Sequence, residues 1–267
     1  MKVIIPMAGK GSRFLSEADQ NPDYYKPKPL IKIKGKPMIS WAVESLPFVN
    51  LKYRPAKTKF KVDPKDLIFI CRQDHENDFQ ISSELRGLFG EEIIIILIDH
   101  ITRGASETVL MAKDFADPDE AVVVSDSDHF FDGNYFYERI LEKDDDVSGV
   151  IPVWAPPDNE PKWSYSMVEK DGTISAVGEK DEKLAALGAP ANIGAYYFRE
   201  WQMFTREVEA SILENDLTGA EGKKEFYVAP IYHRLIKKGY KIIPAPTPAV
   251  WGLGTPKDVR YFESLDL

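Results

Sequence analysis

A glycine turn near the N-terminus has the composition of a phosphate-binding loop. Gly9-Lys10-Gly11-Ser12-Arg13 follows the apolar run Val3–Ile5, which predicts a strand that ends in this turn. Glycines in such a turn let backbone N–H groups close around a phosphate, because no Cβ blocks the approach. The turn is no dinucleotide fingerprint, since Phe14 stands where the third glycine is needed, and it lacks the Gly-Lys-Ser/Thr ending of a P-loop. The glycines alone are equally typical of any strand-to-loop turn.

Cations beside this turn favour a polyphosphate ligand. Arg13 follows the glycines at once, and Lys26-Pro27-Lys28-Pro29-Leu30 comes shortly after it. A solvated basic loop would have a similar composition. Prolines stiffen the backbone, however, and cations held in place beside a glycine turn suit a triphosphate, whose charge must be neutralised.

A pair of carboxylates provides a candidate metal site. Asp126 and Asp128 stand two residues apart, just past the apolar run Val122–Val124. Alternate residues of an extended chain point to the same side, so both could face one hard cation. An Asp-x-Asp in a polar loop is more often a turn or a helix cap. Its place after a predicted buried strand, together with the two motifs above, favours magnesium.

The overall composition is that of an ordinary globular protein. The 267 residues include 34 basic and 43 acidic side chains, and the net charge of −9 argues against a general nucleic-acid binder. Cys71 is the only cysteine, which excludes an internal disulfide. The longest aliphatic run, Ile93–Ile98, is far shorter than the roughly 20 residues of a membrane span and predicts a buried strand. With no signal-like N-terminus, we expect a cytoplasmic protein that does not bind membranes.

The elements that must position these motifs alternate in the first half of the chain. Four short aliphatic runs without polar alternation predict strands covered on both faces: 3–5, 67–70, 93–98 and 121–124. Three stretches with helical spacing lie between or after them: 38–46, 79–88 and 108–115. This order predicts a mainly parallel sheet with helices on both faces and ligands at the carboxyl ends of the strands.

The second half differs in pattern but continues the same unit. After about residue 150, short aromatic-rich strands are followed by helical stretches at 201–213 and 227–238. We expect a single domain over 1–267, with a nucleotide-binding half (1–150) and an acceptor-binding half (151–267). The Lys-rich stretch 52–65 is typical of an exposed, solvated loop.

The order Gly-x-Gly-x-Arg followed by Pro-Lys-Pro-Leu resembles the sugar-phosphate nucleotidylyltransferases, an NTP transferase family. The resemblance covers nearly the whole chain, with one insertion near 50–65. It implies a Rossmann-like, GT-A type three-layer α/β/α sandwich with a mostly parallel mixed sheet. It also implies that Arg13 and Lys28 are catalytic and grip the nucleotide's phosphates, with Lys26 ranked second. The nucleotide-binding residues that it implies are Ala8, Gly9, Gly11, Ser12, Arg13, Lys28, Gly104 and Ala105.

The resemblance extends to the acceptor and to the metal. It implies that Asp126 holds Mg²⁺, and the spacing of the acidic pair adds Asp128 as a second candidate ligand. The family often carries Trp-Asp-x-Gly-Thr near the C-terminus, whereas this chain has Gly252 after the tryptophan. Glycine offers no ligand, so either Asp128 replaces the missing carboxylate or the cation has fewer contacts. The acceptor-binding residues that the resemblance implies are Tyr165, Ser166, Glu179, Lys180 and Gly194.

Together the motifs predict transfer of a nucleoside monophosphate from a triphosphate to a sugar 1-phosphate or similar small phosphorylated acceptor, with release of pyrophosphate. Such a reaction belongs to nucleotide-sugar and polysaccharide biosynthesis. Two alternatives remain at this stage: a GT-A glycosyltransferase that consumes a nucleotide sugar, and a non-catalytic nucleotide-sugar sensor, suggested by Gly252. The sequence identifies neither the base nor the acceptor, and it leaves a homo-oligomer open.

Overall fold

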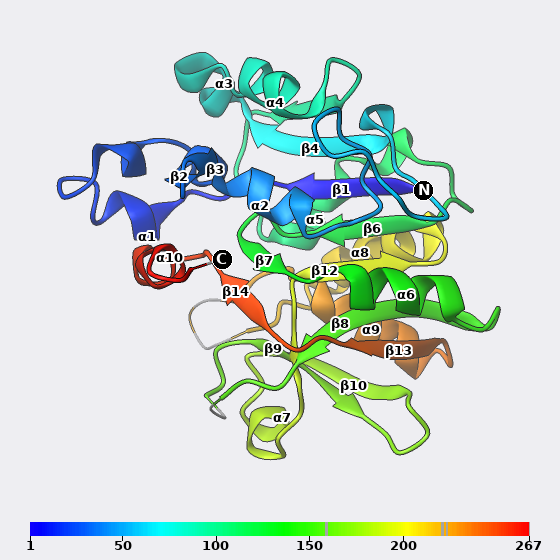
Figure 1. Ribbon diagram of the computed structural model, residues 1–267. Helices are drawn as coiled ribbons and strands as arrows, with labels where there is room; N and C mark the ends of the chain where they lie inside the picture. The colour runs from blue at the N-terminus through cyan, green and yellow to red at the C-terminus, as the bar shows by residue number, and fades with distance from the viewer. Residues whose placement is uncertain (158–159, 220–221, 223, 267) are drawn as a thin grey trace.

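A ten-stranded mixed sheet organises the protein (Figure 1). The computed structural model describes residues 1–157, 160–219, 222 and 224–266. The strand order is β10-β9-β11-β8-β12-β6-β1-β4-β5, and β13 pairs with β8. The strands are β1 (Lys2–Pro6), β4 (Leu67–Arg72), β5 (Ile94–Ile98), β6 (Val122–Ser125), β8 (Val147–Trp154), β9 (Ser164–Val168), β10 (Ile174–Glu179), β11 (Ala191–Asn192), β12 (Ala195–Phe198) and β13 (Lys241–Pro246).

The register of the central strands explains how distant motifs meet. Strands β6, β1, β4 and β5 pair in parallel, and Ile4 of β1 lies opposite both Ile68 of β4 and Val124 of β6. The carboxyl ends of β1 and β6 therefore share one edge of the sheet, where the glycine turn and the acidic pair follow them. Pairing in the second half is mostly antiparallel, with β13 parallel to β8.

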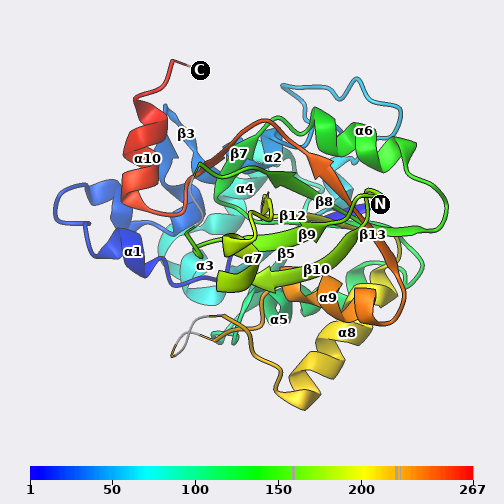
Figure 2. The same cartoon turned by 90° about the horizontal axis from the view of Figure 1, so that it is seen from below.

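Helices cover both faces of this sheet (Figure 2). One face packs against α2 (Met38–Glu44), α4 (Ile81–Phe89) and α6 (Asn134–Glu142). The other packs against α5 (Ala105–Leu110), α8 (Trp201–Glu214) and α9 (Ala229–Lys237). Val3 and Ile5 face the first layer and Ile4 the second, so β1 is apolar at every interior position. The expected three-layer α/β/α class is confirmed.

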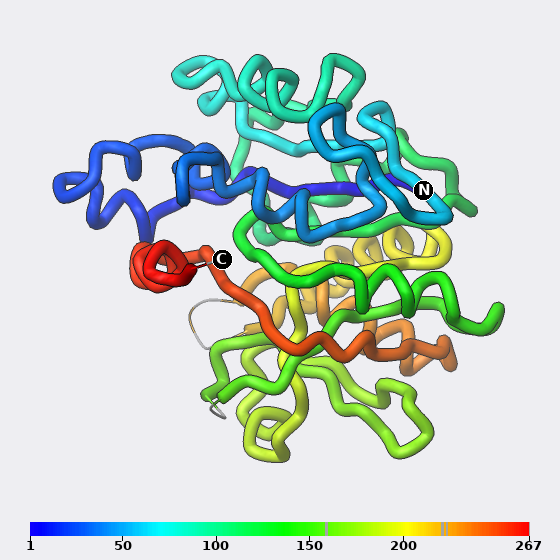
Figure 3. Tube along the Cα trace, viewed as in Figure 1, coloured from blue at the N-terminus to red at the C-terminus, as the bar shows by residue number. Residues whose placement is uncertain are grey.

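The C-terminal segment returns to the N-terminal loop (Figure 3). Strand β14 (Val250–Gly252) pairs antiparallel with β7 (His129–Phe131), and α10 (Pro256–Glu263) follows it. Phe262 of α10 packs in one cluster with Phe14 and Tyr24. This cluster braces the loop that carries Arg13 and Lys28. The other α-helices and strands of the described residues are α1 (Ser12–Leu15), β2 (Lys32–Ile33), β3 (Lys36–Pro37), α3 (Gln73–Phe79) and α7 (Glu182–Ala186).

Three sequence-based expectations need correction. The run Ile93–Ile98 is not buried throughout, because β5 is the edge strand and Leu97 is 37% exposed. The helix expected at 79–88 is α4, but it begins only at Ile81, because Phe79 ends a separate helix, α3, and Gln80 between them is left-handed (φ 49°). The helix expected at 108–115 is α5 with a separate 3₁₀ turn after it. Within the described ranges, the helices are all too short or too polar to cross a bilayer.

Candidate active site

The acidic pair occupies the edge of the sheet directly after β6. The backbone N–H of Asp126 donates to the carbonyl oxygen of Gly194 at 2.7 Å. A Cβ at Gly194 would lie 2.4 Å from Oδ2 of Asp126, so any larger residue there would displace this carboxylate. Gly194 therefore acts by leaving space for Asp126.

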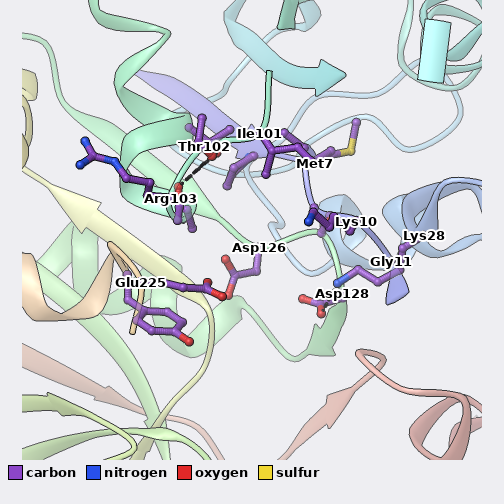
Figure 4. A pocket seen from close by; sticks show the side chains of 18 of the residues that line it. Met7, Lys10, Gly11, Lys28, Ile101, Thr102, Arg103, Asp126, Asp128 and Glu225 are labelled. Atoms are coloured by element: carbon purple, nitrogen blue, oxygen red, sulfur yellow. Dashed lines mark hydrogen bonds and ion pairs between the residues drawn. The ribbon is translucent and has the colours of Figure 1, made fainter. Parts of the chain in front are cut away.

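The two predicted cations converge on Asp128. Lys28 Nζ lies 2.6 Å from Oδ2 of Asp128, and Figure 4 shows the two side chains pointing toward each other. A Cβ at Gly254 would lie 3.0 Å from Oδ2 of Asp128 and 3.9 Å from Nη1 of Arg13, which places both groups beside this glycine. The structure thus brings Arg13, Lys28 and the acidic pair to one place.

The electrostatic environment separates the two carboxylates. Burial and the nearby charge of Asp128 raise the pKa of Asp126 to about 8, and Glu179 adds to the effect. Burial also disfavours ionisation of Asp128, but the charge and hydrogen bond of Lys28 hold its pKa below the usual range. Without a cation, the pair therefore titrates as a unit in which Asp128 ionises first.

Two cavities meet at this pair. The larger has a volume of about 720 Å³ and lies between the glycine turn and residues 101–105. The smaller has a volume of about 260 Å³ and extends toward β9, β10 and β14. Asp126, Asp128, Ala105 and Tyr227 line both. A molecule in each cavity would therefore meet at the acidic pair.

Most of the predicted nucleotide-binding residues line the larger cavity. Of these, Ala8, Gly9, Gly11, Ser12, Lys28, Gly104 and Ala105 line it, and Arg13 lines the smaller cavity. Gly11 has φ 64°, which favours glycine, at the turn into α1. Gly104 is needed for a close approach, since a Cβ there would lie 2.4 Å from the backbone nitrogen of Phe226. Lys10 and Thr102, which are not among the predicted nucleotide-binding residues, also line this cavity.

Glu179 and Gly194, two of the predicted acceptor-binding residues, line the smaller cavity together with Trp163 and Ser164. Lys180 stands behind its wall: Nζ donates to the hydroxyl of Tyr227 at 2.8 Å and lies 3.3 Å from Oε1 of Glu179. Burial alone would lower the pKa of Lys180, but these two partners raise it, so the ammonium stays charged.

Tyr165 and Ser166 do not reach either cavity. Tyr165 is fully buried, packs against Ala185 and Ala191, and donates its hydroxyl to the carbonyl of Glu160. Ser166 Oγ donates to Oδ1 of Asn192 at 2.6 Å. Trp163 and Ser164, which precede them on the chain, line the smaller cavity instead. Spacing along β9 does not reveal which side chain points inward.

His129 is a site residue that the sequence analysis missed. It is 5% exposed, lines the smaller cavity, and its Nε2 has no hydrogen-bond partner in the described part of the protein. A ring nitrogen and one oxygen from each of Asp126 and Asp128 lie within 4.8 Å of one another. Burial lowers the pKa of His129 to about 4, so the ring is neutral at physiological pH. Two carboxylates and a neutral imidazole suit a divalent cation.

An α/β/α fold with a glycine turn, paired cations and an acidic pair at the carboxyl ends of parallel strands defines a class of nucleotide-dependent transferases. Residues 2–229 match the family described as Nucleotidyl transferase, and the chain belongs to this family. It is a nucleotidyltransferase. No curated protein matches the chain.

Solved structures share the fold. The chain is similar to the nucleoside-diphosphate-sugar pyrophosphorylase from Vibrio cholerae RC9, with a TM-score of 0.74 and 22% identity over 98% of this chain and 100% of that one. It is similar to a Bacillus anthracis protein provisionally described as a glucose-1-phosphate thymidylyltransferase (TM-score 0.69, 17% identity, 100% and 97% covered). A third is the inositol-1-phosphate CTP transferase from T. maritima (TM-score 0.67, 12% identity, 96% and 90% covered).

Proposed function

We propose that the protein joins a nucleoside monophosphate from a triphosphate to a small phosphorylated acceptor, a sugar 1-phosphate or a similar compound, and releases pyrophosphate. The observation that carries this proposal is the meeting of two cavities at Asp126 and Asp128. The nucleotide occupies the larger cavity, and the acceptor occupies the smaller one. The halves 1–150 and 151–267 contribute mainly to the first and the second, respectively.

The main physical difficulty of this reaction is that both reactants are anions. Lys28 and Arg13 neutralise the triphosphate and orient it, since both lie beside Asp128 at the junction of the cavities. A divalent cation held by Asp126 and Asp128, with Mg²⁺ the expected one, supplies further positive charge against the phosphates. Lys180 remains cationic and steadies the attacking phosphate from behind Tyr227. No covalent enzyme intermediate is needed.

The size of the smaller cavity favours a compact acceptor. Its volume of about 260 Å³ is below the 300–1,000 Å³ that is typical of drug-sized ligands, so a monosaccharide or polyol phosphate suits it better than a polymer. Solved structures of the same fold are described by names that include both kinds of acceptor, glucose 1-phosphate and inositol 1-phosphate. Glu179 lines this cavity and is placed to accept hydrogen bonds from acceptor hydroxyls.

The test combines each of the common nucleoside triphosphates with Mg²⁺ and a panel of phosphorylated acceptors, and measures pyrophosphate. We expect pyrophosphate with at least one pair. In the Lys28→Ala variant, kcat/KM should fall at least about 100-fold, because a preorganised cation at the developing charge is lost. Lys32→Ala is the matched control: this lysine is exposed on β2, lines no described cavity, and should leave turnover unchanged.

Two results would contradict the proposal. Release of nucleoside diphosphate from a nucleotide sugar, without pyrophosphate, would identify a glycosyltransferase. Tight nucleotide binding without turnover on any acceptor would identify a sensor.

A further inference from the structure

The cation site contains more than the acidic pair. His129 reaches the same cluster from β7, and among the residues that the structure describes its buried Nε2 has no hydrogen-bond partner. Buried polar nitrogens are nearly always paired, so an unpaired one on a ring that also offers a nitrogen within 4.8 Å of both carboxylates needs an explanation. Binding to a cation is a direct one, because imidazole nitrogen and carboxylate oxygen are both common metal ligands.

The position of His129 also bears on the glycine at 252, where the family often has an aspartate. These two residues lie directly opposite each other in the antiparallel pair β7–β14. Side chains of directly opposed residues project from the same face of the ribbon. The imidazole of His129 therefore projects from the face on which a side chain at 252 would stand. Because glycine has no side chain, His129 is the residue of this opposed pair that projects a side chain from that face.

We propose that His129 is a third ligand of this cation site, and that the site therefore binds a first-row transition-metal ion such as Mn²⁺ more tightly than Mg²⁺. Mg²⁺ is a hard cation that prefers oxygen ligands, whereas a nitrogen ligand favours the transition-metal ions. The proposal rests on the proposed function only for the location of the cation at Asp126 and Asp128. Its own content is the nitrogen ligand and the resulting preference.

The decisive experiment is pulsed electron paramagnetic resonance of Mn²⁺ bound to the full chain, without nucleotide. We expect the ¹⁴N modulation of a coordinated imidazole, replaced by the ¹⁵N pattern when the histidines carry ring ¹⁵N. His129→Asn should abolish it. His100→Asn is the matched control, because this histidine is exposed and lies beside Asp99. Bound Mn²⁺ without nitrogen modulation, or wild-type protein that binds no Mn²⁺ at millimolar concentration and pH 8.5, overturns the proposal.

Affinities supply a second readout. His129→Asn should weaken Mn²⁺ binding at least about tenfold, because loss of even an indirect contact to a metal ligand commonly costs that much. Mg²⁺ binding should change far less, so the preference for Mn²⁺ shrinks. An equal loss for both cations would show that His129 acts only through the fold.

A rescue variant tests the relation to Gly252. Among the described residues, a Cβ at 252 would meet only Trp163, at an ordinary 3.6 Å, so an aspartate can be accommodated there. We expect His129→Asn combined with Gly252→Asp to bind Mg²⁺ more tightly than the wild type and to show no nitrogen modulation. Weaker Mg²⁺ binding in this double variant would contradict the assignment of His129 to the face that a side chain at 252 would share.

Asp126→Asn separates failure of this inference from failure of the proposed function. If Mn²⁺ binding survives that change, the cation site of the proposed function is wrong. If Asp126→Asn abolishes Mn²⁺ binding but the wild type shows no nitrogen modulation, only the role of His129 is wrong.

Discussion

Replacing Asp126 by asparagine should stabilise the cation-free protein while it removes activity. The pKa of Asp126 is raised from 3.8 to about 8, chiefly by burial and by the charge of Asp128. Between these values, the folded state retains a proton that the unfolded state has lost, so stability falls as pH rises through this interval. Asparagine does not titrate, so the stability of the variant does not fall over this pH interval.

The magnitude follows from the size of the shift. About four pKa units at ~1.4 kcal/mol each set an upper limit of ~6 kcal/mol at pH 8.5. The carboxylate borders an open cavity, toward which it can turn when it ionises, so we expect at least ~2 kcal/mol. For a chain of this size that corresponds to a rise in Tm of at least about 4 °C. Below about pH 4 the two proteins should be equally stable, since both states of Asp126 are then protonated.

The assay is thermal and urea unfolding of both proteins between pH 4 and 9, in a chelator. Asp128→Asn is the matched control with the opposite sign: its carboxylate is paired with Lys28 at 2.6 Å, so that variant should be less stable at pH 8.5. With saturating divalent cation, the wild type should become the more stable protein relative to Asp126→Asn. An Asp126→Asn variant that is less stable than the wild type at pH 8.5 without cation would refute the reasoning.

Three further predictions concern Asp126, Gly194 and Cys71. Cation affinity should fall about tenfold for each pH unit below 8, because a proton must leave Asp126, and calorimetry in two buffers of different ionisation enthalpy measures the proton released. Gly194→Ala should lower kcat at least about 100-fold by displacing that carboxylate, whereas Gly87→Ala, where a Cβ meets nothing within 4 Å, should not; unchanged turnover in the first variant would contradict this. Cys71 is buried and its pKa is raised to about 12, so a thiol reagent should modify it only after unfolding; rapid labelling of the native protein would show otherwise.

Much of the site was predictable because it depends on local patterns and on one rule of topology. The apolar runs at 3–5 and 121–124 identified β1 and β6, and the carboxyl ends of parallel strands share an edge. Adjacency of these strands then brings the glycine turn to Asp126.

Other features depend on pairing between distant segments, which spacing does not record. The edge position of β5 follows from the order of the strands, and the same apolar run would be buried if another strand lay beyond it. Tyr165 and Ser166 follow the cavity-lining Trp163 and Ser164 on the chain, but their hydroxyls bond to Glu160 and Asn192 instead. His129 becomes a site residue because β14 returns to pair with β7 and places a glycine opposite it.

The most direct test of the central claim is to follow which phosphorus is transferred. With a triphosphate labelled at the α-phosphate, the account predicts that label enters the acceptor product, whereas label at the γ-phosphate appears only in pyrophosphate. Transfer of the γ-label to the acceptor, or recovery of all α-label as free nucleotide, would contradict it.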